Sequence, residues 1–231
     1  MVKLDDLTIT CKYSRRRRTI GLVVTAAGNL EVAAPWGTPQ AKIAQVVAQH
    51  RPWIERKAAA RREAWARLKP GTAFYLGQPY RLHVVRGSRA AVELGADQIT
   101  IQLPAAGSAP WPTLTDWYHQ QAERLLGERV KYFSLRLGLN GGQVQVKDWK
   151  SRWGECRPRQ GGLLRFNWRL VMLPPEILDY VVAHELTHLK EAGHNRRFWR
   201  QVATVLPDYA HRRRWLNLYG TPFLTWQPSN Y

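Results

Sequence analysis

The chain has 231 residues, of which 45% are hydrophobic and 11% aromatic, so it can bury a core and is not a disordered chain. Lys and Arg number 35 against 17 Asp and Glu, a formal net charge of +18. The two cysteines, Cys11 and Cys156, exclude a disulfide scaffold. The N-terminus lacks an apolar signal core and no run is long enough to cross a bilayer, so we expect a cytoplasmic protein without a membrane partner.

The first half of the chain has mostly strand patterns. Strands are predicted at residues 7–13, 19–25 and 30–34, followed by a helix from Pro39 to about Leu68 that Pro52 kinks. Four further strands are predicted at residues 74–76, 80–85, 91–94 and 99–103. Prolines then gather between Pro104 and Pro112, which is typical of a linker. We therefore predict a strand-rich region with one long helix over residues 1–106, and a catalytic domain over residues 107–231.

The second half is mainly helical. A helix is predicted at residues 114–137, and strands at 144–149 and 163–170 with a turn at Trp153-Gly154 between them. Another helix is predicted from Pro174-Pro175 to about Ala192, with Gly193 as the residue that ends it, and then two helices at 196–206 and 209–218. The fold class is thus α+β: a strand-rich N-terminal part and a helical core with a small sheet.

The helix predicted from residue 174 contains the sequence His184-Glu185-Leu186-Thr187-His188, an H-E-x-x-H motif. Residues four apart lie one above the other on a helix, so His184 and His188 can direct two imidazoles at one metal ion. Glu185 is turned away from that face, where its carboxylate can reach a water beside the metal. The pattern predicts a site for a single zinc ion, with Glu185 as the general base.

A catalytic zinc ion has three protein ligands and one open position. His194 follows His188 by six residues, with Gly193 before it to turn the chain back, so we expect His194 to be the third ligand. Glu191 is a competing third ligand because it lies on the His188 side of the helix. Cys156 is a further possible ligand, although a small buried residue is the plainer interpretation.

Hydrolysis also needs a group that stabilises the developing negative charge. The candidates are Arg152, Lys150 and Tyr209, and the first and last of these join Glu185 as predicted catalytic residues. Lys150, Arg152 and Trp153 are predicted to bind substrate. Each has a plainer alternative, which is an exposed charge for the two cations and core packing for the two aromatic residues.

Several of these motifs resemble the YgjP-like metallopeptidase domain family. The resemblance is carried by Tyr180–Leu189, Gly193-His194-Asn195, Phe198-Trp199, Lys150–Cys156 and Asn167 with Leu170, and in the first half by Arg17–Ile20, Gly28, Ala34-Pro35 and Trp53-Ile54. That family usually has Trp-Gly-Ser-Cys where this chain has Glu155 in place of the serine, so any role of the serine is not shared here. The resemblance implies a zincin fold, with the three histidines as zinc ligands and Glu185 as base.

The resemblance leaves the substrate open. The family is similar to the SprT-like and WLM proteases that act on proteins crosslinked to DNA, which implies a peptide or protein substrate near nucleic acid. A member of the family has also been assigned a UTP pyrophosphatase activity, and here Arg15–Arg18, Lys150 and Arg152 are available to hold phosphates. The third alternative is a nucleic-acid-binding module with a structural zinc, since the net positive charge attracts polyanions. The sequence does not indicate an oligomeric state.

Overall fold

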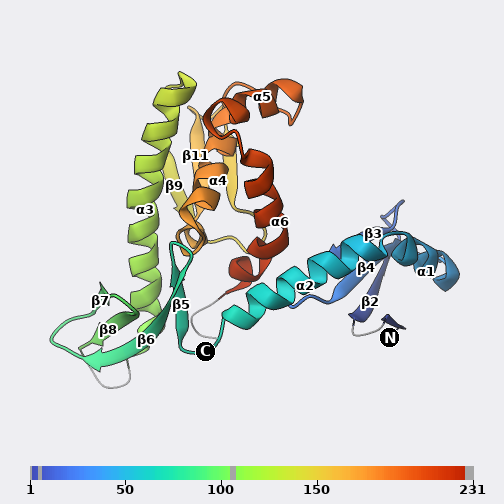
Figure 1. Cartoon of the computed structure of the whole chain (residues 1–231), viewed down its shortest axis with the longest axis horizontal. Coiled ribbons are helices and arrows are strands. Elements are labelled where there is room, and N and C mark those ends of the chain that lie inside the picture. The colour runs from blue at the N-terminus through green and yellow to red at the C-terminus, as the bar shows by residue number, and fades with distance from the viewer. Residues whose placement is uncertain (1, 5–6, 105–107, 227–231) are drawn as a thin grey trace. The chain divides into compact units, whose positions relative to one another are not determined.

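The computed structural model describes residues 2–4, 7–104 and 108–226. Within these residues the fold is α+β, as expected, with three small sheets (Figure 1). The helices are α1 (Gln40–Gln49), α2 (Arg51–Arg67), α3 (Pro110–Leu137), α4 (Pro175–Thr187), α5 (Arg196–Val205) and α6 (Tyr209–Thr225). None of these helices combines the length and apolarity that a membrane crossing requires.

The chain divides into two compact units. The first comprises Met1–Arg67 with Leu218–Pro222, and the second comprises Leu68–Asn217 with Phe223–Tyr231. The boundary predicted between residues 106 and 107 lies outside the described residues. The first of the two units reaches Arg67, the last residue of α2, before the second unit begins.

The first unit is built on a four-stranded sheet of order β1-β2-β4-β3, with strands β1 (Val2–Leu4), β2 (Leu7–Ser14), β3 (Gly21–Val24) and β4 (Leu30–Pro35). Its core joins strand residues such as Leu30 and Val32 to Val47 of α1 and Ile54 of α2. The long helix predicted here is broken at His50, which ends α1. Pro52 has no N–H to donate and its ring clashes with the preceding turn, so the predicted kink is a full break.

The second unit begins with a sheet of order β5-β6-β8-β7, with strands β5 (Thr72–Tyr75), β6 (Gln78–Arg86), β7 (Ala91–Leu94) and β8 (Gln98–Leu103). These four strands confirm the pattern predicted for residues 74–103. Helix α3 then begins at Pro110, inside the segment expected to be a linker, because proline is tolerated in the first turn of a helix. It ends where Gly138 adopts a left-handed conformation with φ 60°.

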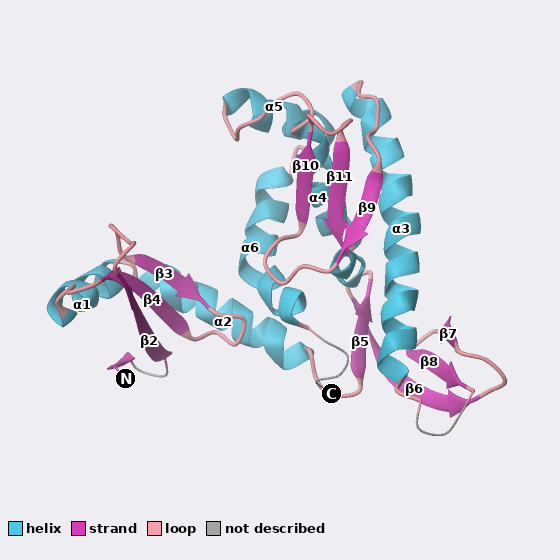
Figure 2. Ribbon diagram, turned by 180° about the vertical axis from the view of Figure 1, so that it is seen from behind, coloured by secondary structure: helices cyan, strands magenta, loops and turns pink. Residues whose placement is uncertain are grey.

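The third sheet has the order β10-β11-β9, with strands β9 (Val144–Lys147), β10 (Gly154–Arg157) and β11 (Leu163–Asn167). Figures 1 and 2, which view the molecule from opposite sides, show α4 lying along this sheet with α3 beside β9. The predicted turn at Trp153-Gly154 is wrong, since Gly154 begins β10. The strand predicted to reach residue 170 ends at Asn167, whose side chain accepts a hydrogen bond from the Arg169 N–H and starts a 3-10 helix over Trp168–Met172.

Helix α4 is shorter than predicted. It ends at Thr187 with His188 as its C-cap, so it does not reach Ala192 and Gly193 is not the residue that ends it. The Thr187 hydroxyl donates to the Ala183 carbonyl at 2.8 Å, and the Leu189 N–H bonds a carbonyl only three residues back, that of Leu186, at 3.0 Å. This tightening of the last turn starts the loop that leads to His194.

Candidate metal centre

His184, His188 and His194 form a group able to hold a metal ion. His184 lies in the last turn of α4, His188 is its C-cap, and His194 comes from the loop before α5. The ligand atoms of the three side chains lie within 4.8 Å of one another. The Nε2 atom of His194 is 2.9 Å from that of His184 and 3.2 Å from that of His188. The nitrogen ligands of a tetrahedral zinc ion lie roughly 3.4 Å apart, so the group fits zinc with little adjustment.

Two of the three imidazoles, those of His184 and His194, are set up to be neutral, as metal ligation requires. Burial lowers the pKa of His184 to about 3, and the charges of His188, His194 and Arg213 add to that effect. Partial burial and the charges of His188 and Arg213 also lower the pKa of His194. Nδ1 of His188 lies 2.9 Å from the Glu191 carbonyl oxygen, and because a carbonyl oxygen only accepts, Nδ1 carries the proton and donates. In the neutral ring, Nε2 of His188 then has a free lone pair, and this nitrogen lies on the side of the other two histidines.

One aromatic ring packs against all three imidazoles. Phe198 in α5 is fully buried, and its ring centroid lies 4.9 Å from that of His184, 4.6 Å from that of His188 and 4.8 Å from that of His194. The ring excludes water from one side of the histidine group. A water or substrate molecule can therefore reach the metal position only from a side that Phe198 does not cover.

Glu185 is positioned by strand β10. Its side chain is 8% exposed, and the Cys156 N–H donates a hydrogen bond to its carboxylate. A Cβ atom placed on Gly154 would lie only 2.6 Å from Cγ of Glu185 and 2.7 Å from its Oε1, so only glycine permits this approach. Burial, together with the charge of Glu155, raises the pKa of Glu185 to about 7. A carboxyl with that pKa can both accept and return a proton near neutral pH.

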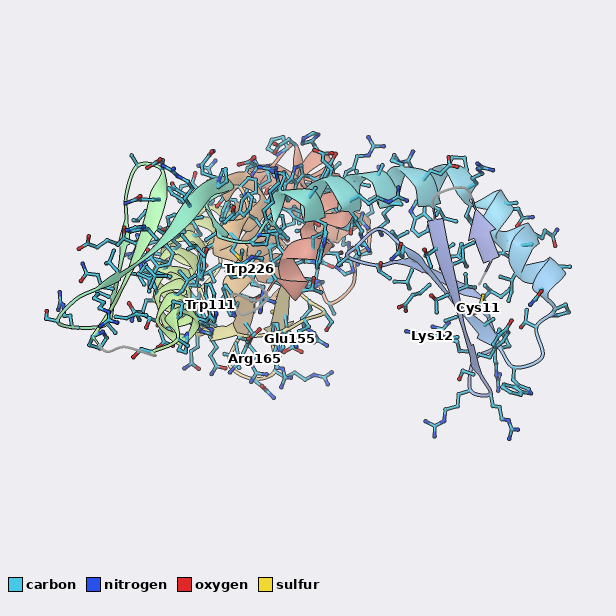
Figure 3. All side chains as sticks on the ribbon, turned by 90° about the horizontal axis from the view of Figure 1, so that it is seen from below. Cys11, Lys12, Trp111, Glu155, Arg165 and Trp226 are labelled. Atoms are coloured by element: carbon cyan, nitrogen blue, oxygen red, sulfur yellow. The ribbon has the colours of Figure 1, made fainter. Side chains whose placement is uncertain are left out.

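Glu155, the residue that departs from the family pattern, is surrounded by arginines. Its carboxylate lies 2.9 Å from Nε of Arg157, 3.1 Å from Nη1 of Arg152 and 3.5 Å from Nη1 of Arg165. Figure 3 shows Glu155 and Arg165 close together on this sheet. The hydrogen bond from Arg157 and the charges of all three arginines lower the pKa of Glu155. The cluster holds three positive charges against one negative charge. Two of its members, Glu155 and Arg152, lie near enough to Glu185 to act on its pKa.

The other predicted site residues are distributed around this centre. Arg152 lies 5.4 Å from the centroid of the Trp149 ring, while its charge lowers the pKa of Glu185. The Tyr209 ring stacks on the Trp199 ring with centroids 5.1 Å apart, and the Trp199 ring in turn stacks on that of His194. Lys150 is exposed.

The segment that carries Lys150, Arg152 and Trp153 is fixed by one buried amide. The side chain of Asn167 donates to the Trp149 carbonyl at 2.6 Å and to the Arg152 carbonyl at 3.0 Å. The Asn167 N–H donates to the Trp153 carbonyl at 2.8 Å. Trp153 therefore contributes its backbone to the site's framework, and its side chain is only half-buried.

The two alternative ligands, Glu191 and Cys156, do not join the histidine group. The Glu191 carboxylate accepts a hydrogen bond from the Asn195 amide at 3.3 Å, and its side chain lines a neighbouring pocket. Burial and the charge of Glu185 raise the pKa of Cys156 to about 12, which keeps it a neutral thiol at neutral pH. Among the described residues, neither belongs to a group arranged for a metal ion.

Sequence reasoning missed one cation at this centre. Arg213 of α6, which no sequence motif singles out, is exposed and has its guanidinium 4.5 Å from the centroid of the Trp199 ring. Its charge acts on the pKa values of His184, His194 and Tyr180, so it is close enough to influence the metal position. No spacing in the sequence relates α6 to the H-E-x-x-H motif, so only the packing of α6 reveals this residue.

One comparison with known proteins, the match to a family model, agrees with this site. The model of the family described as YgjP-like, metallopeptidase domain, matches residues 18–219. A search of curated proteins finds no match. Among solved structures, one match is the crystal structure of the metallopeptidase zymogen of Pyrococcus abyssi abylysin. The two sequences are 24% identical and the TM-score is 0.36, and the match covers 39% of this chain and 91% of that one. A TM-score this low says nothing about the chemistry of the present chain.

Proposed function

The chain belongs to the YgjP-like metallopeptidase domain family, and from that membership we propose that it is a zinc-dependent metallopeptidase that hydrolyses peptide bonds with an activated water. The observation that supports this most directly is the convergence of the three Nε2 atoms beside the buried Glu185. A set of three protein ligands is typical of catalytic zinc, whereas structural zinc is closed by four.

His184, His188 and His194 would hold the ion. When bound, zinc lowers the pKa of a coordinated water to about 7 and polarises a carbonyl oxygen. Glu185 accepts the proton of the attacking water and later delivers it to the leaving nitrogen. Its pKa of about 7 suits both transfers, and Gly154 and the Cys156 N–H hold the carboxylate in place.

Two cations flank this arrangement and are available for the negative charge that develops on the substrate. Arg213 approaches from α6 through its contact with Trp199, and Arg152 approaches from the loop before β10. Arg152 also has Glu155 at 3.1 Å, so part of its charge is already neutralised. We therefore assign the larger contribution to Arg213, and we assign to Tyr209 a packing role against Trp199.

The test is a comparison of the wild-type protein with Glu185→Gln. Both are loaded with zinc, their zinc content is measured, and both are incubated with casein and with a mixed peptide library. We expect both proteins to bind one zinc ion and only the wild type to cleave. Cleavage by Glu185→Gln at the wild-type rate would remove Glu185 from the mechanism and with it this proposal.

One observation favours a second candidate, a nucleotide pyrophosphohydrolase. The three arginines around Glu155 offer guanidinium groups that suit phosphate oxygens. Against this, the described residues contain no group of three or more acidic side chains arranged for Mg²⁺. UTP is therefore included in the same assay, with zinc and with Mg²⁺. Turnover of UTP without cleavage of any peptide would favour this candidate, and turnover of neither would favour a binding module with a structural zinc.

A further inference from the structure

His194 is the ligand that the fold constrains least by secondary structure. His184 and His188 belong to the end of α4, but His194 lies in the loop between α4 and α5 and its side chain is exposed. An exposed imidazole in a loop loses rotational freedom when it binds a metal, and that loss weakens binding unless the protein has already fixed the ring.

Trp199 contacts His194 in two independent ways. Its indole Nε1–H donates to the backbone carbonyl of His194 at 3.0 Å, which fixes the main chain of the loop at that residue. Its ring stacks on the His194 imidazole with centroids 5.6 Å apart and an interplanar angle of 22°. One side chain therefore restrains both the backbone and the ring of the third ligand.

The indole is itself held from helix α6. The Tyr209 ring stacks on Trp199 at 5.1 Å with an interplanar angle of 13°, and the Arg213 guanidinium lies 4.5 Å from the Trp199 centroid. These residues are four apart on α6, so they lie on the same face of that helix. Tyr209 and Arg213 of α6 thus both pack against the indole that restrains His194.

We propose that Trp199 is a positioning residue that fixes His194 for metal binding, through its hydrogen bond to the His194 carbonyl and its stacking on the His194 ring. The inference concerns the same metal centre as the proposed function, but it makes a statement about metal affinity that holds whatever the substrate is. Residues that orient a metal ligand typically change metal affinity about 10- to 100-fold when they are removed.

The test measures zinc affinity of the full chain by competition with a chromophoric chelator. We expect Trp199→Ala to bind zinc about 10- to 100-fold more weakly than the wild type. Trp199→Phe keeps a stacking ring and loses only the Nε1–H bond, so we expect a smaller loss. The visible absorption of bound Co²⁺ reports the ligand geometry directly, and we expect its intensity to change in Trp199→Ala.

A matched control separates positioning from general stability. Trp117 in α3 is also half-buried and also packs on aromatic rings, those of Tyr75 and Tyr118, both at 5.1 Å. We expect Trp117→Ala to lower the melting temperature of the metal-free protein without changing the zinc dissociation constant. Equal weakening of zinc binding in Trp117→Ala and Trp199→Ala would overturn the proposal.

A double-mutant cycle asks whether Trp199 acts through His194. In a His194→Ala background, Trp199→Ala is expected to weaken zinc binding no further, because the ligand that it positions is already gone. A further loss of the same size in that background would overturn the proposal. If Trp199→Ala fails to fold, the cycle is carried out with Trp199→Phe. None of these measurements uses catalysis, so a chain without peptidase activity can still pass them.

Discussion

Burial makes the stability of the metal-free protein depend on the ionisation of Glu185. Its pKa rises from 4.5 in the unfolded reference to about 7, so in the metal-free protein the ionised carboxylate is disfavoured by folding. Below pH 4.5 the group is protonated in both states and costs no stability. As the pH rises from 4.5 to about 7, Glu185 ionises first in the unfolded chain, so the folded state loses stability. The full penalty is present above pH 7.

We therefore expect Glu185→Gln to stabilise the metal-free protein at pH 8. A shift of this size corresponds to roughly 3 kcal/mol, because each pKa unit is worth about 1.4 kcal/mol. The gain should shrink as the pH falls and vanish near pH 4. Urea unfolding of both proteins in the presence of a chelator, at several pH values, measures it. A gain independent of pH would contradict the assignment of the effect to ionisation of Glu185.

Gly154 allows the Glu185 carboxylate to lie against strand β10. We expect Gly154→Ala to displace that carboxylate, because the added methyl would lie 2.6 Å from Cγ of Glu185. Displacement of a catalytic group by about 1 Å costs on the order of 100-fold in rate, while the zinc content should stay unchanged. Gly127→Ala in α3, where nothing lies within 4 Å of the added atom, is the control that should retain full activity. An unaffected rate in Gly154→Ala would show that the carboxylate has room to move.

At the scale of elements, α5 presents Phe198 and Trp199 to the histidines, and it begins directly after His194. Asn195 is its N-cap, and the Asn195 side chain accepts the Phe198 N–H at 2.9 Å. We expect Asn195→Ala to destabilise the second unit by about 1 kcal/mol and Asn195→Asp, which keeps the acceptor, to restore most of it. Thermal unfolding measures both, and equal melting temperatures for the two variants would contradict a capping role.

The sequence predicted the elements unequally. The H-E-x-x-H motif lies in the last turn of α4 and its C-cap, so local spacing alone brings His184, Glu185 and His188 together. Strand β10 was missed because the four residues Gly-Glu-Cys-Arg at the edge of a sheet show no alternation of apolar and polar side chains. The end of α4 was predicted several residues late, since a tightening of the last turn leaves no mark as strong as a glycine.

The residues that surround the histidines were harder to predict than the histidines themselves. Phe198 and Trp199 entered only through a family resemblance, and nothing in the sequence singled out Arg213. Each reaches the centre because α5 and α6 pack against α4, and single-sequence spacing carries no information about such packing. The contact of Gly154 with Glu185 is of the same kind, because it joins residues 31 positions apart in the printed sequence.

At the scale of the whole molecule, the net charge of +18 attracts polyanions at long range. We expect the protein to bind single-stranded oligonucleotides with an affinity that falls steeply between 50 and 200 mM salt, because bound cationic side chains release counterions. Fluorescence anisotropy of a labelled oligonucleotide at several salt concentrations measures the slope. Because Glu185→Gln changes the charge by only one unit, it serves as a control that should behave like the wild type. Binding that does not respond to salt, or no binding at low salt, would contradict this expectation.

The partner of His188 has a consequence for how the centre tolerates change. Nδ1 of that ring is satisfied by the peptide oxygen of Glu191 and not by the carboxylate. Main-chain atoms are common to all amino acids, so the tautomer of this ligand is independent of which residue occupies position 191. Variation at that position is therefore free to reshape the surface beside the metal while the ligand itself keeps its orientation.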